Sequence, residues 1–543
     1  MEKNIDPSTV EFGTSLPPQG PHTITVHLPG YENAKAIRDG DQSVLAKLKS
    51  IYPRFCPFGL SAQLCGTIAS KIPSLPEGYG CAAYTSPDVW ASNRGFAASP
   101  RHREEARMDP AEFKYYVVRI NGVRLYVVAF PLAKSGVSMF QWQHGGLGFS
   151  TRVAEALLGH DVVYEGEYTF DTEREQLPEP TYFPEGESHA LIRERIAGLL
   201  MRATAKDHAK RVLAGDVFLY QTGMAAITRL HEAIRGIEGN TGPVVVFGAV
   251  FHNSYHVFEE SEGGGIKHYG KADEADIDDF EKYLEEKGEV SYVFTEFPSN
   301  PIMVSVDLMR LRKLADKYGF ILVVDDTVAS FANIDLLAAA DIILSSLTKS
   351  FSGYADVMAG SVVLNPNSEA AYASLKPVLT RNFRNELFEE DVKVLLRNSN
   401  DYLERSAVLN RNAAALAKYF HGRKDKITRV WYPPYSPGSG YLGEFMRKKT
   451  EEFPEPGYGC LLSVEFDTIE KTKAFYDNVN FFSGPHLGAH LTLALAYNLL
   501  AYGKENPEEH AAYGVRQEQV RISVGLEDED VLISRCEDAL SKI

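Results

Sequence analysis

Cysteine is scarce in this chain. The 543 residues include five cysteines, and no two of them form a C-x-x-C pair. An odd number of widely spread cysteines suggests neither a disulfide framework nor a zinc site. We therefore expect a protein of a reducing compartment, the cytoplasm, with no bound metal. The cysteines are Cys56, Cys65, Cys81, Cys460 and Cys536.

Long apolar runs and blocks of basic residues are absent as well. A membrane-spanning helix needs about 20 apolar residues in succession, and no run in this sequence approaches that length. The first residues, Met1 to Pro7, lack the apolar region of a secretion signal. Acidic residues outnumber basic ones by 73 to 56, and no basic block offers a surface for nucleic acid. We expect no membrane insertion, no export and no nucleic-acid partner.

What the sequence does contain is an alternation of strand-like and helix-like patterns from residue 188 onward. Short apolar runs suit buried strands, and stretches with apolar residues three or four apart suit helices. Such alternation predicts βαβ units, and hence an α/β protein with a mostly parallel sheet. We expect strands at 244–247, 290–294, 320–324, 342–344, 360–364, 460–466 and 520–524, and helices at 308–318 and 403–420.

Three regions are expected along the chain. Residues 1–165 form an N-terminal extension, in which two strand-like runs flank Asn121-Gly122, a pair suited to the type I′ turn of a β-hairpin. Residues 166–366 contain the main sheet and begin with a charged, proline-bearing stretch, Asp171 to Pro184, that predicts an extended arm. Residues 367–543 predict a smaller C-terminal α/β domain, because longer helical patterns dominate there.

A lysine and a carboxylate follow two successive strand candidates. Lys349 comes shortly after the run Asp341 to Leu344, and Asp325 follows the run Phe320 to Val324. Because ligands of such sheets bind beyond the carboxyl ends of the strands, the two side chains can meet at one ligand. Pyridoxal phosphate (PLP) requires an amine for its Schiff base and an acid beside its ring nitrogen. Either residue alone is more often an ordinary surface charge; together they favour a PLP site.

A candidate for phosphate binding lies upstream. The run Tyr220 to Ile227 predicts a loop that turns into a helix at Gly223. Backbone N–H groups at a helix N-terminus attract anions, and glycine lets the backbone come close. Ser346 and Thr348 add hydroxyl groups beside Lys349, so these residues together predict a phosphate cup.

Five motifs in order resemble the Cys/Met-metabolism PLP enzymes of fold type I, and among them the fungal cystathionine γ-synthases. They are Thr222 to Ala226, Glu296 to Pro301, Val324 to Thr327, Ser346 to Lys349 and Val520 to Glu527. The fungal branch is indicated by Phe351-Ser352-Gly353, Val357 to Gly360 and Leu487 to Leu493, and, in the N-terminal extension, by Phe140 to His144 and Ser150 to Arg152. The resemblance thus spans nearly the whole chain.

This resemblance implies roles for individual residues. Lys349 would form the Schiff base and move protons, Asp325 would pair with the pyridine nitrogen, and Arg521 would bind the substrate α-carboxylate. Guanidinium suits that task because it binds a carboxylate bidentately. The remaining residues expected at the cofactor are Gly223, Met224, Phe251, Asn300, Thr327, Ser346, Thr348 and Tyr182. Thr492 and His490 are expected at the substrate.

Two departures from the family pattern concern the cofactor. Phe251 stands where the family usually has a tyrosine on the pyridine ring; phenylalanine still stacks but has no hydroxyl. In the arm, the family offers a tyrosine and an arginine to the phosphate of the neighbouring subunit. Here Tyr182 is present, whereas Pro184 and its apolar and acidic neighbours replace the arginine.

A third departure concerns the substrate. Leu491 stands where bacterial relatives have an acidic residue near the substrate's amino end, and His486 and His490 lie close to it in sequence. Histidine titrates near neutral pH, so either could act on an incoming nucleophile or a bound carboxylate. The alternative is that both are supporting or surface histidines, which is the more common case.

The resemblance implies γ-replacement on an O-activated L-homoserine, of the O-acetyl type, through a vinylglycine-type ketimine. Cysteine is the default nucleophile, and cystathionine would be the product. One alternative is a carbon nucleophile, a β-keto acid or an aldehyde, giving pipecolate-type amino acids as in fungal specialised metabolism. A second alternative is a γ- or β-lyase, which needs the same cofactor residues.

Other classes of protein fit the sequence less well. A non-catalytic PLP-fold protein would not need both Lys349 and Asp325, and a dinucleotide-binding oxidoreductase would need G-x-G-x-x-G after its first strand. The resemblance further implies small-molecule amino-acid substrates. It also implies a homotetramer or homodimer whose subunits share active sites through the arm around Tyr182.

Overall fold

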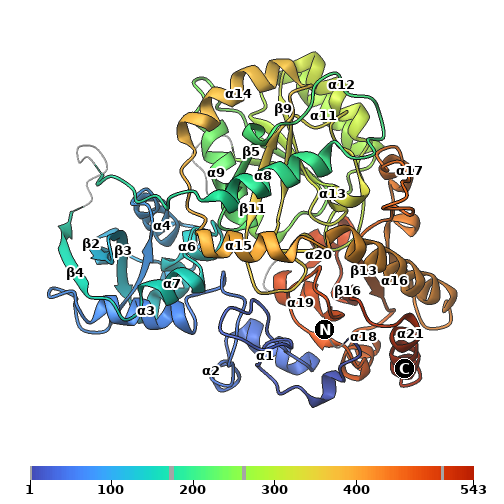
Figure 1. Ribbon diagram of the computed structural model, residues 1–543. Coiled ribbons are helices and arrows are strands. Elements are labelled where there is room, and N and C mark those ends of the chain that lie inside the picture. Colours follow the sequence, from blue (N-terminus) through green and yellow to red (C-terminus); the bar gives the residue numbers. More distant parts are fainter. Residues whose placement is uncertain (1–2, 170–176, 260–264, 503–506) are drawn as a thin grey trace.

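The computed structural model describes residues 3–169, 177–259, 265–502 and 507–543, and it contains three β-sheets (Figure 1). Residues 171–176 of the expected arm lie outside the described residues. A four-stranded sheet belongs to the first third of the chain, a seven-stranded sheet to the middle and a five-stranded sheet to the last third. Among the helices of these ranges, none has the length and apolar character to cross a membrane.

The first sheet is antiparallel, with strand order β1-β3-β2-β4. Asn121 and Gly122 join β2 to β3 with φ angles of 46° and 79°, so the predicted hairpin turn is confirmed. β4 completes the sheet and runs past residue 165. The strands are β1 (Tyr79–Tyr84), β2 (Lys114–Ile120), β3 (Val123–Pro131) and β4 (Val162–Tyr168); the helices beside them are α3 (Leu60–Ala69), α4 (Val89–Ala98), α5 (Ser135–Ser138), α6 (Phe140–Gln143) and α7 (Thr151–Leu157).

The central sheet has the order β5-β11-β10-β9-β8-β6-β7. Its neighbours from β10 to β7 pair in parallel, and β11 is antiparallel to both β10 and β5. The predicted α/β class with a mostly parallel sheet is therefore confirmed. The strands are β5 (Val217–Tyr220), β6 (Val244–Phe247), β7 (Ile266–Tyr269), β8 (Tyr292–Glu296), β9 (Ile321–Asp325), β10 (Ile342–Ser345) and β11 (Gly360–Leu364).

Helices bury both faces of this sheet. Along β6, Val244 and Val246 belong to one apolar core, whereas Val245 and Phe247 belong to another. Burial on both faces explains why these strands read as continuous apolar runs in the sequence. The helices of this region are α8 (Glu187–Leu200), α9 (Gly223–Arg235), α10 (His252–Glu259), α11 (Glu274–Lys287), α12 (Leu308–Tyr318), α13 (Ser330–Asn333), α14 (Glu369–Asn382) and α15 (Glu389–Asn398).

The C-terminal sheet has the order β12-β13-β16-β15-β14 and is mostly antiparallel, with one parallel pair, β14 and β15. Its strands are β12 (Arg429–Trp431), β13 (Leu461–Glu465), β14 (Phe482–Ser483), β15 (Leu493–Leu495) and β16 (Gln519–Ser523). Its helices are α16 (Tyr402–Gly422), α17 (Ser439–Gly443), α18 (Ile469–Asn478), α19 (Tyr497–Tyr502), α20 (Pro507–Ala512) and α21 (Glu529–Leu540).

Residues 13–55, here called the N-terminal segment, do not join the first sheet. They include α1 (Tyr31–Asp39) and α2 (Gln42–Leu45) and lie against the C-terminal third of the chain (Figure 1). The Leu28 N–H donates to the Ser483 carbonyl at 2.8 Å, and the Ile24 N–H donates to the Ala355 carbonyl at 2.9 Å. The segment is thereby fixed to the edge of β14 and to the loop between β10 and β11.

Candidate active site

A cavity of about 490 Å³ opens beyond the carboxyl ends of the central strands. Lys349, after β10, and Asp325, at the end of β9, both line it, and so do Gly223 and Arg521. Residues from three distant parts of the sequence thus meet where ligands of such sheets are expected. Other lining residues named in the sequence analysis are Met224, Phe251, Asn300, Thr327 and Ser346.

Lys349 is half-buried, and its amine has one polar contact of note. Nζ lies 3.5 Å from the Tyr52 hydroxyl and 5.0 Å from the centre of the Tyr52 ring. Burial lowers the pKa of Lys349, and the nearby charges of Arg521 and Arg54 lower it further. A depressed pKa increases the share of neutral amine, which is the form that attacks a carbonyl group.

Two buried carboxyl groups form the floor of the cavity. Asp325 and Glu296 are paired residues at the ends of β9 and β8. Asp325 accepts a hydrogen bond of 2.8 Å from the Thr327 N–H, and burial raises its pKa to about 6. Glu296 accepts from the N–H groups of Phe251 and Asn300 at 2.6 and 3.1 Å, and burial together with the Asp325 charge raises its pKa well above the usual value. This floor would stabilise a positively charged ring nitrogen.

The start of α9 forms a cradle at one end of the cavity. Thr222 caps the helix, and its hydroxyl accepts from the Ala225 N–H at 2.8 Å. A Cβ added to Gly223 would come within 2.7 Å of the Ser346 side chain, so only glycine leaves room there. The free N–H groups of the first turn, together with Ser346, suit a phosphate group.

Arg521, on β16, lies at another wall. Its guanidinium donates to the Asn300 side-chain oxygen at 3.2 Å and to the Pro485 carbonyl at 2.7 Å, and it stacks 4.1 Å from the centre of the Tyr497 ring. These contacts fix the orientation of the guanidinium. Among the described residues, no carboxylate forms an ion pair with Arg521. Arg521 can therefore bind the carboxylate of a ligand.

Four predicted site residues do not line the cavity, and their side chains contact other parts of the protein. The Thr348 hydroxyl donates to the Ala359 carbonyl at 3.1 Å, the Thr492 hydroxyl donates to Glu527 at 2.8 Å, and His490 Nε2 donates to the Pro17 carbonyl at 2.9 Å. Tyr182 is 41% exposed, and its ring lies 5.2 Å from the Arg384 guanidinium. Their roles toward cofactor, substrate or a second subunit stay predictions.

Leu491, His486 and His490, which were named as a departure from the family pattern near the substrate, are all buried. His486 is fully enclosed, and neither of its ring nitrogens has a hydrogen-bond partner within the described part of the chain. Burial and the charge of Lys349 lower its pKa well below the usual value, so His486 is neutral near pH 7. Leu491 belongs to an apolar cluster with Leu16 and Ile24 of the N-terminal region.

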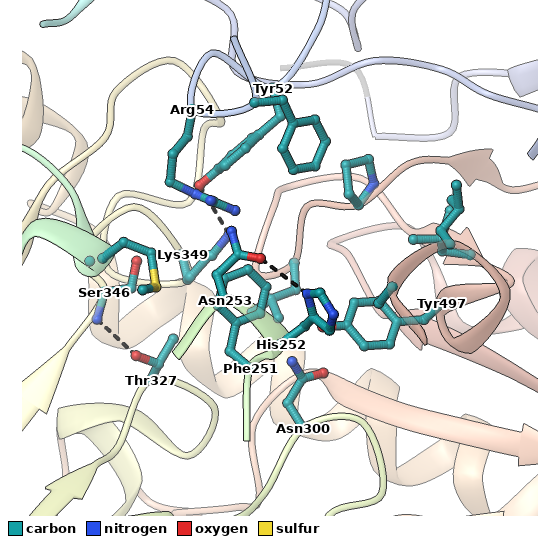
Figure 2. A pocket seen from close by; sticks show the side chains of 18 of the residues that line it. Tyr52, Arg54, Phe251, His252, Asn253, Asn300, Thr327, Ser346, Lys349 and Tyr497 are labelled. Carbon is teal, nitrogen blue, oxygen red and sulfur yellow. Dashed lines mark hydrogen bonds between the residues drawn. The ribbon is translucent and has the colours of Figure 1, made fainter. Parts of the chain in front are cut away.

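Sequence reasoning missed the contribution of the N-terminal extension. Tyr52, Arg54, Gln143 and His144 line the cavity together with the carboxyl-end loops. Figure 2 labels Tyr52 and Arg54 beside Lys349. The Arg54 guanidinium lies 5.3 Å from the centre of the Phe251 ring. The resemblance of Phe140 to His144 was the one available signal. No local pattern marks Tyr52, because its contact with Lys349 spans 297 residues of sequence.

The cavity meets the requirements of PLP. It offers a half-buried amine in Lys349, a buried carboxyl group in Asp325, a glycine cradle at a helix N-terminus and an aromatic ring in Phe251. The cradle is the most specific of these features, because a Cβ at Gly223 would fill it. The residues present therefore fit the cofactor that the motifs imply.

Comparison with known proteins supports the same conclusion. The family model described as Cys/Met metabolism PLP-dependent enzyme matches residues 168–541. The cystathionine gamma-synthase-like protein ankD of Aspergillus thermomutatus is 32% identical, over 98% of this chain and 95% of the relative. The alanine racemase ungC of Aspergillus violaceofuscus is 37% identical, over 77% of this chain and 73% of the relative.

Among solved structures, the cystathionine gamma synthase of Xanthomonas oryzae matches with a TM-score of 0.55 and 22% identity. The match covers 69% of this chain and 90% of that chain, which supports the fold. Family model, fungal relatives and fold all point to the same family of enzymes. The chain belongs to the Cys/Met-metabolism family of PLP-dependent enzymes, as a cystathionine γ-synthase-like member of fold type I.

Proposed function

We propose that this enzyme replaces the γ-substituent of an O-activated L-homoserine, of the O-acetyl type. The observation that carries the proposal is that Lys349 and Arg521 line one cavity above the Asp325 carboxyl group. Arg521 would hold the substrate α-carboxylate, with Asn300 orienting the guanidinium at 3.2 Å. The substrate carbons next to that carboxylate would then face the Lys349 amine.

The residues divide the chemistry in the following way. Lys349 removes a proton from Cα and later a proton from Cβ, which must leave before the γ-substituent can depart, and its lowered pKa suits it to these transfers. Asp325 balances positive charge at the ring nitrogen of the cofactor. When bound, PLP supplies an electron sink that makes loss of the γ-substituent feasible. The nucleophile then adds at Cγ, and Lys349 returns a proton to Cβ and then one to Cα.

Cysteine is the acceptor that we propose first, with cystathionine as product. The relative ankD is named a cystathionine gamma-synthase-like protein, which supports this choice. A carbon acceptor, a β-keto acid or an aldehyde, is the second candidate. It is favoured by the apolar wall that the N-terminal segment and α19 give the cavity, formed by Leu28, Ile37, Leu45 and Leu500.

Mass spectrometry of products separates these candidates. Purified enzyme is incubated with O-acetyl-L-homoserine and with cysteine, acetoacetate or an aldehyde in parallel. The mass of cystathionine in the cysteine reaction is the expected result, and a γ-substituted product in another reaction identifies a carbon acceptor. Release of keto acid and ammonia without any acceptor would instead indicate a lyase. Because the relative ungC is named an alanine racemase, L-alanine is included and its conversion to the D form is measured.

The cofactor is tested separately from the reaction. Purified wild-type protein should be yellow, with an absorption band that disappears on reduction with borohydride. The Lys349→Ala variant should be colourless after the same treatment and should melt at a similar temperature. A wild-type protein that stays colourless after addition of PLP would contradict the assignment of Lys349.

A further inference from the structure

Arg54 is a buried cation that has no carboxylate partner among the described residues. Its side chain lines the cavity, and the residue is 4% exposed. The guanidinium donates to the Gln143 carbonyl and interacts with the Tyr52 hydroxyl, and it lies 5.5 Å from the centres of the Tyr52 and Phe55 rings. In the part of the chain that the structure describes, no carboxylate forms an ion pair with it.

Burial of the Arg54 charge lowers the stability of the folded protein when no ligand is bound. Removing a charge from water costs several kcal/mol unless an opposite charge compensates it. Arg54 also lies near the Lys349 amine, whose pKa its charge lowers. The carboxyl groups on the cavity floor are engaged by other groups, Glu296 by two backbone N–H groups and Asp325 by Thr327. A bound anion would compensate Arg54.

The surroundings of Arg54 indicate where that anion would lie. The Gln143 carbonyl, which accepts from Arg54, also accepts from the Asn253 side chain at 3.1 Å. The loop that follows Gln143 at the end of α6 contacts the start of α9, because the Gly146 carbonyl accepts from the Thr222 hydroxyl at 3.0 Å. One loop therefore ties Arg54 to the helix terminus that carries the Gly223 cradle. Figure 2 shows Arg54 and Tyr52 on the same side of Lys349.

We propose that Arg54, brought in by the N-terminal segment, forms an oxyanion-binding site in the cavity that is distinct from Arg521. The ligand is a phosphate or carboxylate group, which the planar fork of a guanidinium binds bidentately. Two sources supply such a group: the phosphate of the cofactor, held jointly with the start of α9, and the carboxylate of the acceptor. Only the second source rests on the proposed function. In the first case Arg54 provides the cation that Pro184 does not.

The first experiment uses the protein without cofactor and needs no turnover. Inorganic phosphate is titrated into wild type, Arg54→Gln and Arg38→Gln, and affinity is measured by calorimetry. Arg38 lines the same cavity but is paired with Asp39 at 2.8 Å, so it is the matched control. We expect at least tenfold weaker phosphate binding for Arg54→Gln and less than a twofold change for Arg38→Gln.

Thermal melting separates ligand binding from a structural role. If the role of Arg54 is to bind an anion, the ligand-free Arg54→Gln protein should have the same melting temperature as wild type or a higher one. The reason is that the substitution removes an uncompensated buried charge. Phosphate should then stabilise wild type more than the variant. A purely structural arginine would give the opposite result, a lower melting temperature at all phosphate concentrations, and that outcome overturns the proposal.

The source of the anion is identified by comparing paired ligands. Loss of Arg54 should reduce the affinity for PLP at least tenfold more than the affinity for pyridoxal, which lacks the phosphate. If the acceptor carboxylate is the source, the KM for cysteine rises at least tenfold while the reaction with cysteamine, which lacks the carboxylate, is unchanged. Either result supports the site. Unchanged phosphate, PLP and cysteine binding in Arg54→Gln would refute it, even if γ-replacement itself is confirmed.

Discussion

The Tyr52 hydroxyl lies 3.5 Å from the Lys349 amine, although 297 residues separate the two in sequence. Tyr52 comes from the N-terminal segment, and Lys349 follows β10 of the central sheet. Phe251, which lines the cavity and is expected to stack on the cofactor ring, has no hydroxyl to offer. Tyr52 therefore provides a phenol next to the amine at a place that the sequence did not indicate.

Replacing Tyr52 with phenylalanine should change proton chemistry at Lys349. The charges of Lys349 and Arg54 lower the pKa of Tyr52, overriding its burial. In the cofactor-free protein we expect one tyrosine that ionises below the usual pKa of about 10 and that is absent from Tyr52→Phe. Ultraviolet absorption of tyrosinate during a pH titration measures this difference. Turnover should fall on the order of 100-fold if the phenol acts as an acid or base.

The matched control for that titration is Tyr419→Phe, because Tyr419 hydrogen-bonds Arg423 far from the cavity and its pKa is raised. This variant should lose a tyrosine that ionises at a higher pH than an ordinary tyrosine. Superimposable titration curves for wild type and Tyr52→Phe would show that Tyr52 does not ionise early.

Substituting Gly223 with alanine should weaken cofactor binding. The added Cβ would come within 2.7 Å of Ser346, so the cradle must widen. We expect a rise of at least tenfold in the Kd for PLP, equivalent to about 1.4 kcal/mol, measured by absorbance titration. Gly198→Ala in α8 is the control, because nothing lies within 4 Å of its Cβ position. That variant should bind PLP normally and be slightly more stable.

Arg521→Lys should impair substrate binding while leaving the cofactor in place. Lysine keeps the positive charge but lacks the planar fork that holds a carboxylate. Hydrogen bonds to charged groups are worth about 1.5 to 3 kcal/mol, so we expect the KM for the amino-acid substrate to rise roughly 10- to 100-fold. Steady-state kinetics measure the KM, and the absorption spectrum checks the cofactor. A normal KM would show that another group binds the α-carboxylate.

Asp326 should make the protein less stable as pH rises. It is buried behind Asp325 and accepts a hydrogen bond of 2.5 Å from the Ser345 hydroxyl, and burial raises its pKa from 3.8 to about 8. Between these two values the folded state holds a proton that the unfolded state has released, so the free energy of unfolding falls as pH increases. Below about pH 4 both states are protonated, and the contribution is fully present.

The Asp326→Asn variant tests this, since asparagine is neutral at every pH in the range. Its stability should be similar to wild type at about pH 4 and greater at about pH 8, by an amount on the order of a few kcal/mol. Denaturant unfolding at several pH values measures the difference. Parallel pH profiles for the two proteins would mean that Asp326 does not hold its proton.

Local patterns predicted much of the central fold. The strands at 244–247 and 360–364 and the helix at 308–318 coincide with β6, β11 and α12, because buried strands and amphipathic helices have distinct periodicities. The late strands were placed within one residue of β13 and β16. The convergence of Lys349 and Asp325 followed from the general position of ligands at the carboxyl ends of parallel strands.

The hydrogen-bond partners of several hydroxyl groups could not be predicted from local sequence patterns. Thr348 and Thr492 belong to family motifs, yet their side chains bond Ala359 and Glu527. Which way a side chain turns from a loop depends on neighbours that the motif does not contain. The course of residues 13–55 across β14 was likewise not encoded in any local pattern, and it rests on contacts such as Leu28 with Ser483.

The sequence by itself determined the family, the α/β fold and the amine–carboxyl pair of Lys349 and Asp325, because motif order and periodicity are local properties. Only the tertiary structure decided that Tyr52 and Arg54 belong to the same cavity. Their positions depend on the path of a segment that lies about 300 residues from Lys349 in sequence, fixed by backbone hydrogen bonds to β14 and the loop after β10. Such long-range contacts arise from packing and leave no periodic signal.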